Sequence, residues 1–249
     1  MSETVKDRTV LVTGAGAGIG AAVARGFAGA GARVRVADID GDAAQLVAGE
    51  IGGTAWTVDL SDTDALGELS LDCDVLVNNA GIQHVSPVES FPPEKFRLIL
   101  ALMLEAPFLL IRAALPHMYA QGFGRIVNIS SVHGLVASPY KSAYVSAKHG
   151  LEGLSKTVAL EGGGQGVTSV CINPGYVRTA LVDRQVTDQA KVHGISEEEV
   201  LEKVFLANSA VKRMVTPAEI ADLAVWLAGP SGAMATGTNF ILDGGWIAH

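Results

Sequence analysis

Short apolar runs rich in β-branched residues alternate with segments of helical periodicity along the chain of 249 residues. This alternation predicts a mostly parallel sheet, because a helix between two strands returns the chain to the same edge of the sheet. The predicted strands span residues 9–13, 33–38, 54–58, 74–78, 125–130, 167–173 and 239–242. The predicted helices span residues 19–30, 43–50, 66–69, 93–119, 142–162 and 217–227, the last with Thr216 as its N-cap.

No linker or repeat divides the sequence, so we expect a single α/β domain over residues 1–249, with a doubly wound, seven-stranded sheet and helices on both faces. Residues 180–215 break the alternation, because they are too long and too polar for a simple connection. Ser196 followed by three glutamates is typical of a helix start. We therefore expect a helical flap at about 180–215, and a mobile loop is the alternative.

The charge and composition exclude several classes of partner. A net charge of −8 argues against nucleic acid or an anionic membrane surface as the main partner. Cys73 and Cys171 lie in apolar runs without metal-ligand spacing, and they indicate reduced core residues of a cytoplasmic protein without a metal site. The polar first residues do not resemble a signal peptide, and no stretch of about 18 apolar residues is free of charge and glycine, so no membrane span is predicted.

A glycine-rich segment, Thr13-Gly-Ala-Gly-Ala-Gly-Ile-Gly20, joins the first predicted strand to the first helix. Glycines there let the main chain approach a pyrophosphate at the positive end of the helix. Gly16, Gly18 and Ala21 fit one dinucleotide pattern, G-x-G-x-x-G/A, whereas Thr13, Gly14, Gly18 and Gly20 fit a second, T-G-x-x-x-G-x-G, which agrees better with a strand ending at Thr13. A plain glycine turn is the alternative, but the position between strand and helix favours a Rossmann-type nucleotide site.

Asp38 ends the second predicted strand. A carboxylate there can accept hydrogen bonds from the adenosine ribose and repels a 2′-phosphate, so it favours NAD over NADP. The alternative is a capping role before Asp40 and Gly41. Asp59-Leu60 and Asn78-Asn-Ala-Gly81 follow the next two strands, at the sheet edge where such folds bind ligands.

Tyr144 and Lys148 lie one turn apart on a predicted helix, and Ser131 precedes Tyr144 by thirteen residues. A phenol with a pKa of about 10 is a poor base at neutral pH, and a nearby ammonium lowers that pKa. Tyr144 could then exchange a proton with a substrate oxygen that Ser131 orients. The bland alternative is an aromatic side chain beside a solvated lysine.

Together these motifs resemble the short-chain dehydrogenase/reductase family, including a Pro174-Gly-Tyr-Val-Arg-Thr179 loop. The resemblance implies hydride transfer between a nicotinamide and a CH–OH group, with Ser131, Tyr144 and Lys148 as catalytic residues. It also implies a homotetramer that pairs the helices at 93–119 and 142–162, although core packing could explain their apolar faces. The cofactor residues it implies are Thr13, Gly14, Ala17, Gly18, Ile19, Gly20, Asp38, Asp59, Leu60, Asn79, Ala80, Gly81, Tyr144, Lys148, Pro174, Gly175, Val177 and Thr179.

Two further residues bear on that resemblance. NADP-preferring relatives often carry a basic residue at the places of Ala17 and Ile39, so both support NAD. Met103 stands where the family usually has an asparagine, 28 residues before the catalytic serine. That asparagine is credited with kinking the helix and holding a water in the proton relay from the lysine. Met103 can do neither, which leaves natural drift, an engineered change or lost activity open.

The segment around the catalytic residues resembles the bacterial D-3-hydroxybutyrate dehydrogenases, and the likeness runs over essentially the whole chain. It implies NAD-dependent oxidation of (R)-3-hydroxybutyrate to acetoacetate, with the small hydroxy acid held by a polar pocket. Alternatives are another hydroxy or oxo substrate, such as a sugar or a 3-oxoacyl thioester, and an NAD-binding sensor with weak turnover. The substrate residues implied are Gln83, Ser131, His133, Lys141, Tyr144, Tyr176, Gln185 and Trp246.

Overall fold

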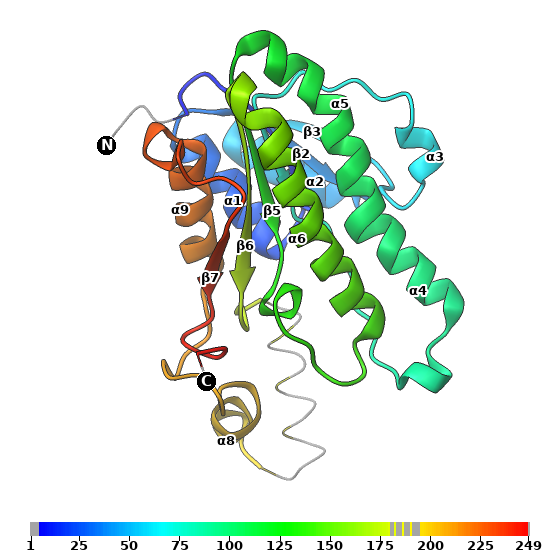
Figure 1. Ribbon diagram of the computed structural model, residues 1–249. Helices are drawn as coiled ribbons and strands as arrows, with labels where there is room; N and C mark the ends of the chain where they lie inside the picture. Colours follow the sequence, from blue (N-terminus) through cyan, green and yellow to red (C-terminus); the bar gives the residue numbers. More distant parts are fainter. Residues whose placement is uncertain (1–4, 180–181, 183–185, 187–189, 191–194, 249) are drawn as a thin grey trace.

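The computed structural model describes residues 5–179, 182, 186, 190 and 195–248. Seven strands form one sheet in the order β3-β2-β1-β4-β5-β6-β7, and every neighbouring pair is parallel (Figure 1). The strand order reverses between β1 and β4, which creates a crevice at the carboxyl ends of the central strands. The strands are β1 (Thr9–Thr13), β2 (Arg33–Asp38), β3 (Thr54–Thr57), β4 (Val75–Asn78), β5 (Gly124–Ile129), β6 (Val167–Pro174) and β7 (Asn239–Leu242).

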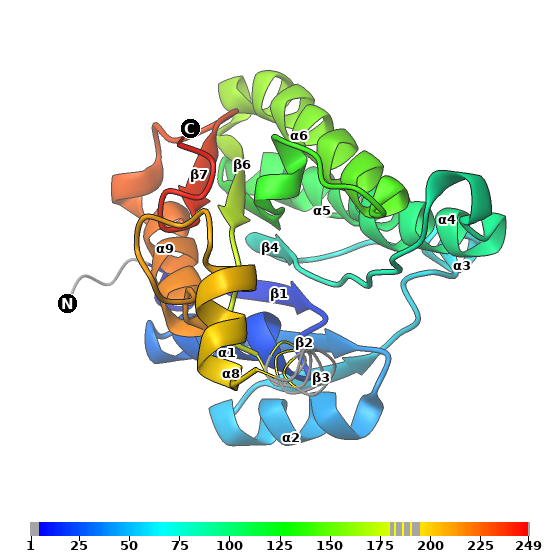
Figure 2. The ribbon, with the colours of Figure 1, turned by 90° about the horizontal axis from the view of Figure 1, so that it is seen from below.

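Helices cover both faces of this sheet (Figure 2). One face carries α1 (Gly18–Gly29), α2 (Gly41–Ile51) and α9 (Pro217–Ala228), and the other carries α4 (Pro93–Leu100), α5 (Ala106–Gln121) and α6 (Ser142–Gly162). Each face of the sheet has its own apolar core. Val10 and Val12 of β1 point into the core beneath α1, α2 and α9, and Leu11 between them points into the core beneath α5. The expected doubly wound, Rossmann-type sheet with helices on both faces is therefore confirmed.

The short helices complete the connections. The described single-turn elements are α3 (Thr63–Leu66), η1 (Val88–Ser90), η3 (Val132–Gly134), η4 (Gly163–Gln165), α8 (Glu197–Val200) and η6 (Pro230–Gly232). A short helix is present near the predicted 66–69, but it spans residues 63–66, because the Asp62 side chain caps it by accepting from Ala65 N and the helix ends before Gly67. Thr216 does cap α9, as predicted, in a capping box with Glu219.

The long helix predicted at 93–119 is interrupted. A π-helical turn, η2 (Ala101–Glu105), separates α4 from α5. Pro107, which has no N–H to donate to the carbonyl of Met103 four residues earlier, follows this turn at the start of α5.

The segment Pro93–Gln121 is long and apolar enough to span a membrane by length and composition alone, with a mean hydropathy of 2.1 in its most apolar window. Of that window, 44% is buried inside the protein. Its Leu110, Ile111 and Met118 pack in the same core as Leu76 and Ile126 of the sheet. The helix is therefore a core helix of this fold, and its remaining apolar surface needs another explanation.

The helix start predicted at Ser196 is present. Ser196 and Glu199 form a capping box at α8, which runs into a second π-helical turn, η5 (Leu201–Phe205). Among the described residues of the flap, Val186 and Ala190 are buried in a cluster with Phe205 and Met214. This apolar cluster fixes the described part of the flap beside β6.

Candidate active site

A cavity of about 840 Å³ opens at the carboxyl ends of the central strands. It brings together residues predicted separately for cofactor and for substrate, from segments more than two hundred residues apart. Its lining includes Ile19, Asn79, Gly81, Gln83, Met103, Ser131, His133, Lys141, Tyr144, Lys148, Pro174, Gly175, Tyr176, Val177, Thr179 and Trp246.

The glycine-rich loop passes the cavity at the start of α1. Gly14 and Gly18 have φ angles of +59° and +56°, and a Cβ on Gly14 would lie 2.8 Å from Ala80 Cα. Ala17 is the N-cap of α1 and supplies no side-chain cap, so the first main-chain N–H groups remain available to an anion. Gly20 packs so closely that a Cβ there would lie 2.2 Å from Gly14 O, which explains the third glycine. This cradle fits the pyrophosphate of a dinucleotide.

Asp38 supports the same loop. Its Oδ2 accepts from Gly16 N at 2.8 Å, and its Oδ1 accepts from Asp40 N at 3.0 Å. The N-cap of α2 is Asp40, which accepts from Ala43 N. Asp38 therefore bonds both the turn before α2 and the glycine-rich loop, while Asp40 supplies the side-chain cap of α2.

The loop after β4 is bonded to the glycine-rich loop, whereas the loop after β3 is held by contacts of its own. Thr13 Oγ1 accepts from both Asn79 N and Ala80 N, and Asn79 Nδ2 donates to Thr13 O and Gly14 O, so the β4 loop is bonded to the glycine-rich loop. Asp59 is exposed, and hydrogen bonds from the hydroxyl and main chain of Ser61 lower its pKa. Leu60 is buried in the core beside them.

Ser131, Tyr144 and Lys148 meet at one end of the cavity, as their spacing predicts. Lys148 Nζ lies 5.7 Å from the centre of the Tyr144 ring and donates to Ile129 O at 2.7 Å. Ser131 Oγ accepts from His133 N at 3.1 Å. The three side chains therefore line the same cavity.

Burial is the largest influence on the pKa values of Tyr144 and Lys148. Burial raises the pKa of Tyr144, and a hydrogen bond with Ser131 opposes the rise. Burial lowers the pKa of Lys148 to about 8. The expected lowering of the phenol pKa by the ammonium together with a positive nicotinamide ring stays a prediction.

Met103 is 1% exposed and lines the cavity from the π-helical turn. A Cβ on Gly81 would lie 3.1 Å from Met103 Cε, so the thioether fills the space beside the β4 loop. We expected the loss of asparagine to leave the helix without its distortion, and that expectation is wrong. The distortion is present as the π-helical turn η2, with methionine at position 103.

The predicted substrate residues gather around His133. Its Nε2 lies 2.7 Å from Ser138 Oγ, and its ring centre lies 5.9 Å from that of Trp246. Burial, with a smaller contribution from Lys141, lowers the pKa of His133 to about 4, and burial also lowers the pKa of Lys141. The pocket therefore presents a neutral imidazole beside a partly desolvated cation.

The remaining predicted residues lie at the rim. Gln83 is exposed at the mouth of the cavity, and Tyr176 packs edge-on against Phe205 at 4.8 Å between ring centres. Gln185 lies outside the described residues. The sequence interpretation missed Ser138, although it stands in the segment 130–150 that the resemblance rested on, and missed Phe205, which no local pattern connects with the site.

Comparison with known proteins agrees with this geometry. The family model for short chain dehydrogenases matches residues 8–190. A D-beta-hydroxybutyrate dehydrogenase from Rhizobium meliloti (strain 1021) is 52% identical over 176 residues, covering 71% of this chain and 68% of the relative. Another from Cupriavidus necator is 46% identical, with the same coverage.

A solved structure agrees over nearly the full length. It is described as a 2-deoxy-D-gluconate 3-dehydrogenase from Agrobacterium tumefaciens with bound NADP, and it is 30% identical, covers 99% of both chains and has a TM-score of 0.88. Within this fold, the present chain carries the glycine-rich cradle and the cluster of Ser131, Tyr144 and Lys148. The chain therefore belongs to the short-chain dehydrogenase family, as an oxidoreductase acting on CH–OH groups that most resembles 3-hydroxybutyrate dehydrogenase.

Proposed function

We propose that the protein catalyses the reversible, NAD-dependent oxidation of (R)-3-hydroxybutyrate to acetoacetate. The observation that carries this is the position of Lys141 and His133 in the cavity that holds Tyr144 and Ser131. A carboxylate that leaves water needs a cation and hydrogen-bond donors. A short 3-hydroxy acid has its carboxylate two carbons from the reacting centre, so one small ligand could meet both ends of this cavity.

Asp38 supports NAD as the cofactor. Its carboxylate is fixed at the loop by two main-chain N–H groups, and an incoming 2′-phosphate would meet that negative charge. The Agrobacterium structure holds NADP, and comparing kcat/KM for NAD with that for NADP tests the preference proposed for this chain. The residues proposed for the nicotinamide end are Lys148, Pro174, Gly175, Val177 and Thr179, all of which line the cavity.

In the proposed reaction, Tyr144 Oη removes the hydroxyl proton of the substrate, and Ser131 Oγ donates to the same oxygen as it becomes a carbonyl. Bound NAD supplies the hydride acceptor. Lys148 holds a positive charge near the phenol, 5.7 Å from its ring centre, and so favours the phenolate. His133 orients Ser131 through its main-chain N–H and presents its ring toward the acid.

The test compares the two enantiomers of 3-hydroxybutyrate with NAD and follows the absorbance of the reduced cofactor. Lys141→Met should raise KM for the R acid about 100-fold with little change in kcat, because it removes the cation that binds substrate and transition state alike. Lys156→Met is the matched control, an exposed lysine on the same helix. Good activity with an uncharged polyol and none with the R acid would contradict the proposal, and NAD binding without turnover on any substrate would favour a sensor.

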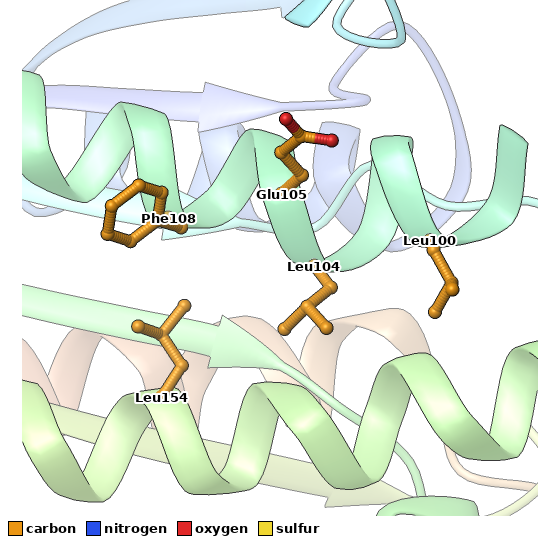
Figure 3. A pocket seen from close by; sticks show the side chains of 5 residues that line it. All are labelled: Leu100, Leu104, Glu105, Phe108 and Leu154. Carbon is orange, nitrogen blue, oxygen red and sulfur yellow. The ribbon is translucent and has the colours of Figure 1, made fainter. Parts of the chain in front are cut away.

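We propose further that the active form is a homotetramer. Leu100, Leu104, Phe108 and Leu154 line an apolar pocket between the long α4–α5 helix and α6 (Figure 3). Further exposed apolar side chains lie on α9, after η6 and on the edge strand β7: Trp226, Met234 and Ile241, which are 45%, 94% and 46% exposed. The proposal is that the pocket beside α6 and the edge at β7 are two separate apolar contact faces, which join four copies of the chain in a closed tetramer.

A further inference from the structure

A buried carboxylate lies beneath the catalytic residues. Glu152 is 4% exposed and follows Tyr144 and Lys148 on α6 at intervals of four residues, so all three share a face. Asn173 Nδ2 donates to its Oε1 at 2.6 Å, and Asn239 Nδ2 donates to its Oε2 at 2.5 Å. An ionised carboxylate is acceptor-only, so amide donors on both oxygens suit the charged form.

The same carboxylate is connected to the catalytic serine. Asn173 is fully buried, and its Nδ2 also donates to Ser131 O at 2.8 Å. A Cβ on Gly134 would lie 2.6 Å from Glu152 Oε1, so the turn after Ser131 rests directly on the carboxylate. Glu152 therefore supports the main chain that carries Ser131 and His133.

Glu152 also faces Lys148 across one helical turn. Among the described residues, Tyr144 on α6 and Cys171 on β6 are further titratable groups near Lys148, while the π-helical turn presents the uncharged Met103. Burial lowers the pKa of Lys148, and Cys171 and Glu152 act in the opposite direction. A negative charge at Glu152 thus favours the protonated lysine that the reaction needs.

We propose that Glu152 is a positioning residue of the active site, which holds the main chain of Ser131 through Asn173 and offsets the charge of Lys148 one turn away. It touches neither substrate nor cofactor. The proposal depends on the proposed function only in that Ser131 and Lys148 act in a dehydrogenase reaction, whichever substrate and cofactor are used.

The charge of Lys148 is tested on the protein without ligands. Titration of ¹³C-labelled lysine side chains by NMR follows each lysine, and the Lys148 signal is assigned by its loss in Lys148→Arg. Glu152→Gln keeps the shape and removes the charge, and it should lower the titration midpoint of Lys148 by about one pH unit. Glu161→Gln removes an exposed charge from the same helix and should leave the midpoint in place.

If Glu152→Gln fails to fold, Asn239→Ala gives the second variant. It removes one of the two donors that hold the Glu152 carboxylate in place, and the Lys148 midpoint should move in the same direction. A midpoint that matches the Glu161→Gln control in every folded variant overturns the proposal.

The link to Ser131 is tested by comparing Asn173→Ala with Asn239→Ala, because each removes one donor to Glu152 and only the first also removes the bond to Ser131 O. The Lys148 midpoint should be similar in the two variants, and kcat should be about tenfold lower in Asn173→Ala, with KM for both substrates little changed. An unchanged kcat in a folded Asn173→Ala also overturns the proposal. Because the titration uses neither substrate nor cofactor, failure of the hydroxybutyrate or NAD assignment leaves its outcome unaffected.

Discussion

The carboxylate of Asp38 accepts a hydrogen bond from the main-chain nitrogen of Gly16 at 2.8 Å. This bond ties the end of β2 to the middle of the glycine-rich loop, where the adenosine ribose of a dinucleotide is expected. The negative charge is therefore part of the cradle and cannot swing away from a 2′-phosphate without breaking the loop's own contact.

Asp38→Ser should shift the cofactor preference toward NADP. Removing one negative charge within a few ångströms of a phosphate relieves repulsion of several kcal/mol, so the ratio of kcat/KM for NADP to that for NAD should rise about 100-fold. Asp42→Ser, which removes an exposed charge in the first turn of α2, should leave the ratio near that of the wild type. An equal NADP-to-NAD ratio of kcat/KM in the two variants would show that Asp38 does not determine the cofactor preference.

Met103→Asn should change turnover by less than about tenfold, because the π-helical turn is already formed by the main chain. The variant should instead lose stability. Met103 packs with Ile99, Ala143 and Ala147, and an amide buried there without partners costs about 1–3 kcal/mol. Met103→Leu, which keeps the site apolar, should stay within about 1.5 kcal/mol of the wild type. A large gain in kcat in Met103→Asn would show that the methionine impairs the proton relay.

His133 should make stability depend on pH. Burial lowers its pKa to about 4, below the value of about 6.5 expected in the unfolded chain. The unfolded state therefore binds more protons between these values, so the free energy of unfolding contributed by His133 is fully present above about pH 6.5 and is lost as the pH falls toward 4.

Urea unfolding at a series of pH values checks this. The difference between the wild type and His133→Gln should change by about 1 kcal/mol per pH unit within that window and stay constant above it. Parallel curves from pH 4 to 7 would mean that the imidazole is not buried in the neutral form.

The sequence predicts much of this fold because its signals are local. Alternating apolar runs, glycines between strand and helix, and a threonine before Pro217 each act within a few residues, and the sheet and the α9 cap follow them. The π-helical turn does not follow from the sequence, because the apolar pattern of residues 93–119 continues through it and a proline does not mark it, since Pro116 lies inside the regular helix α5.

Tertiary contacts set the limits of the prediction for the site. The motif spacing brings Ser131, Tyr144 and Lys148 together, yet their pKa values depend on burial by parts of the chain that no motif includes. In the sequence, Glu152 is an ordinary helix residue. Its contacts with Asn173 of β6 and Asn239 of β7 come from the tertiary fold, which the local pattern does not predict.

The assembly can be tested on its two apolar faces separately. Phe108, 48% exposed on α5, belongs to the pocket beside α6, and Ile241 belongs to the edge strand β7. Phe108→Glu and Ile241→Glu should each convert the tetramer to dimers in sedimentation velocity, because a charge buried in an apolar interface is left without a partner. The double variant should be a monomer. Leu46→Glu is the control, a residue 66% exposed on α2, outside both faces. Tetramers that persist in the double variant would assign the exposed apolar side chains to another role.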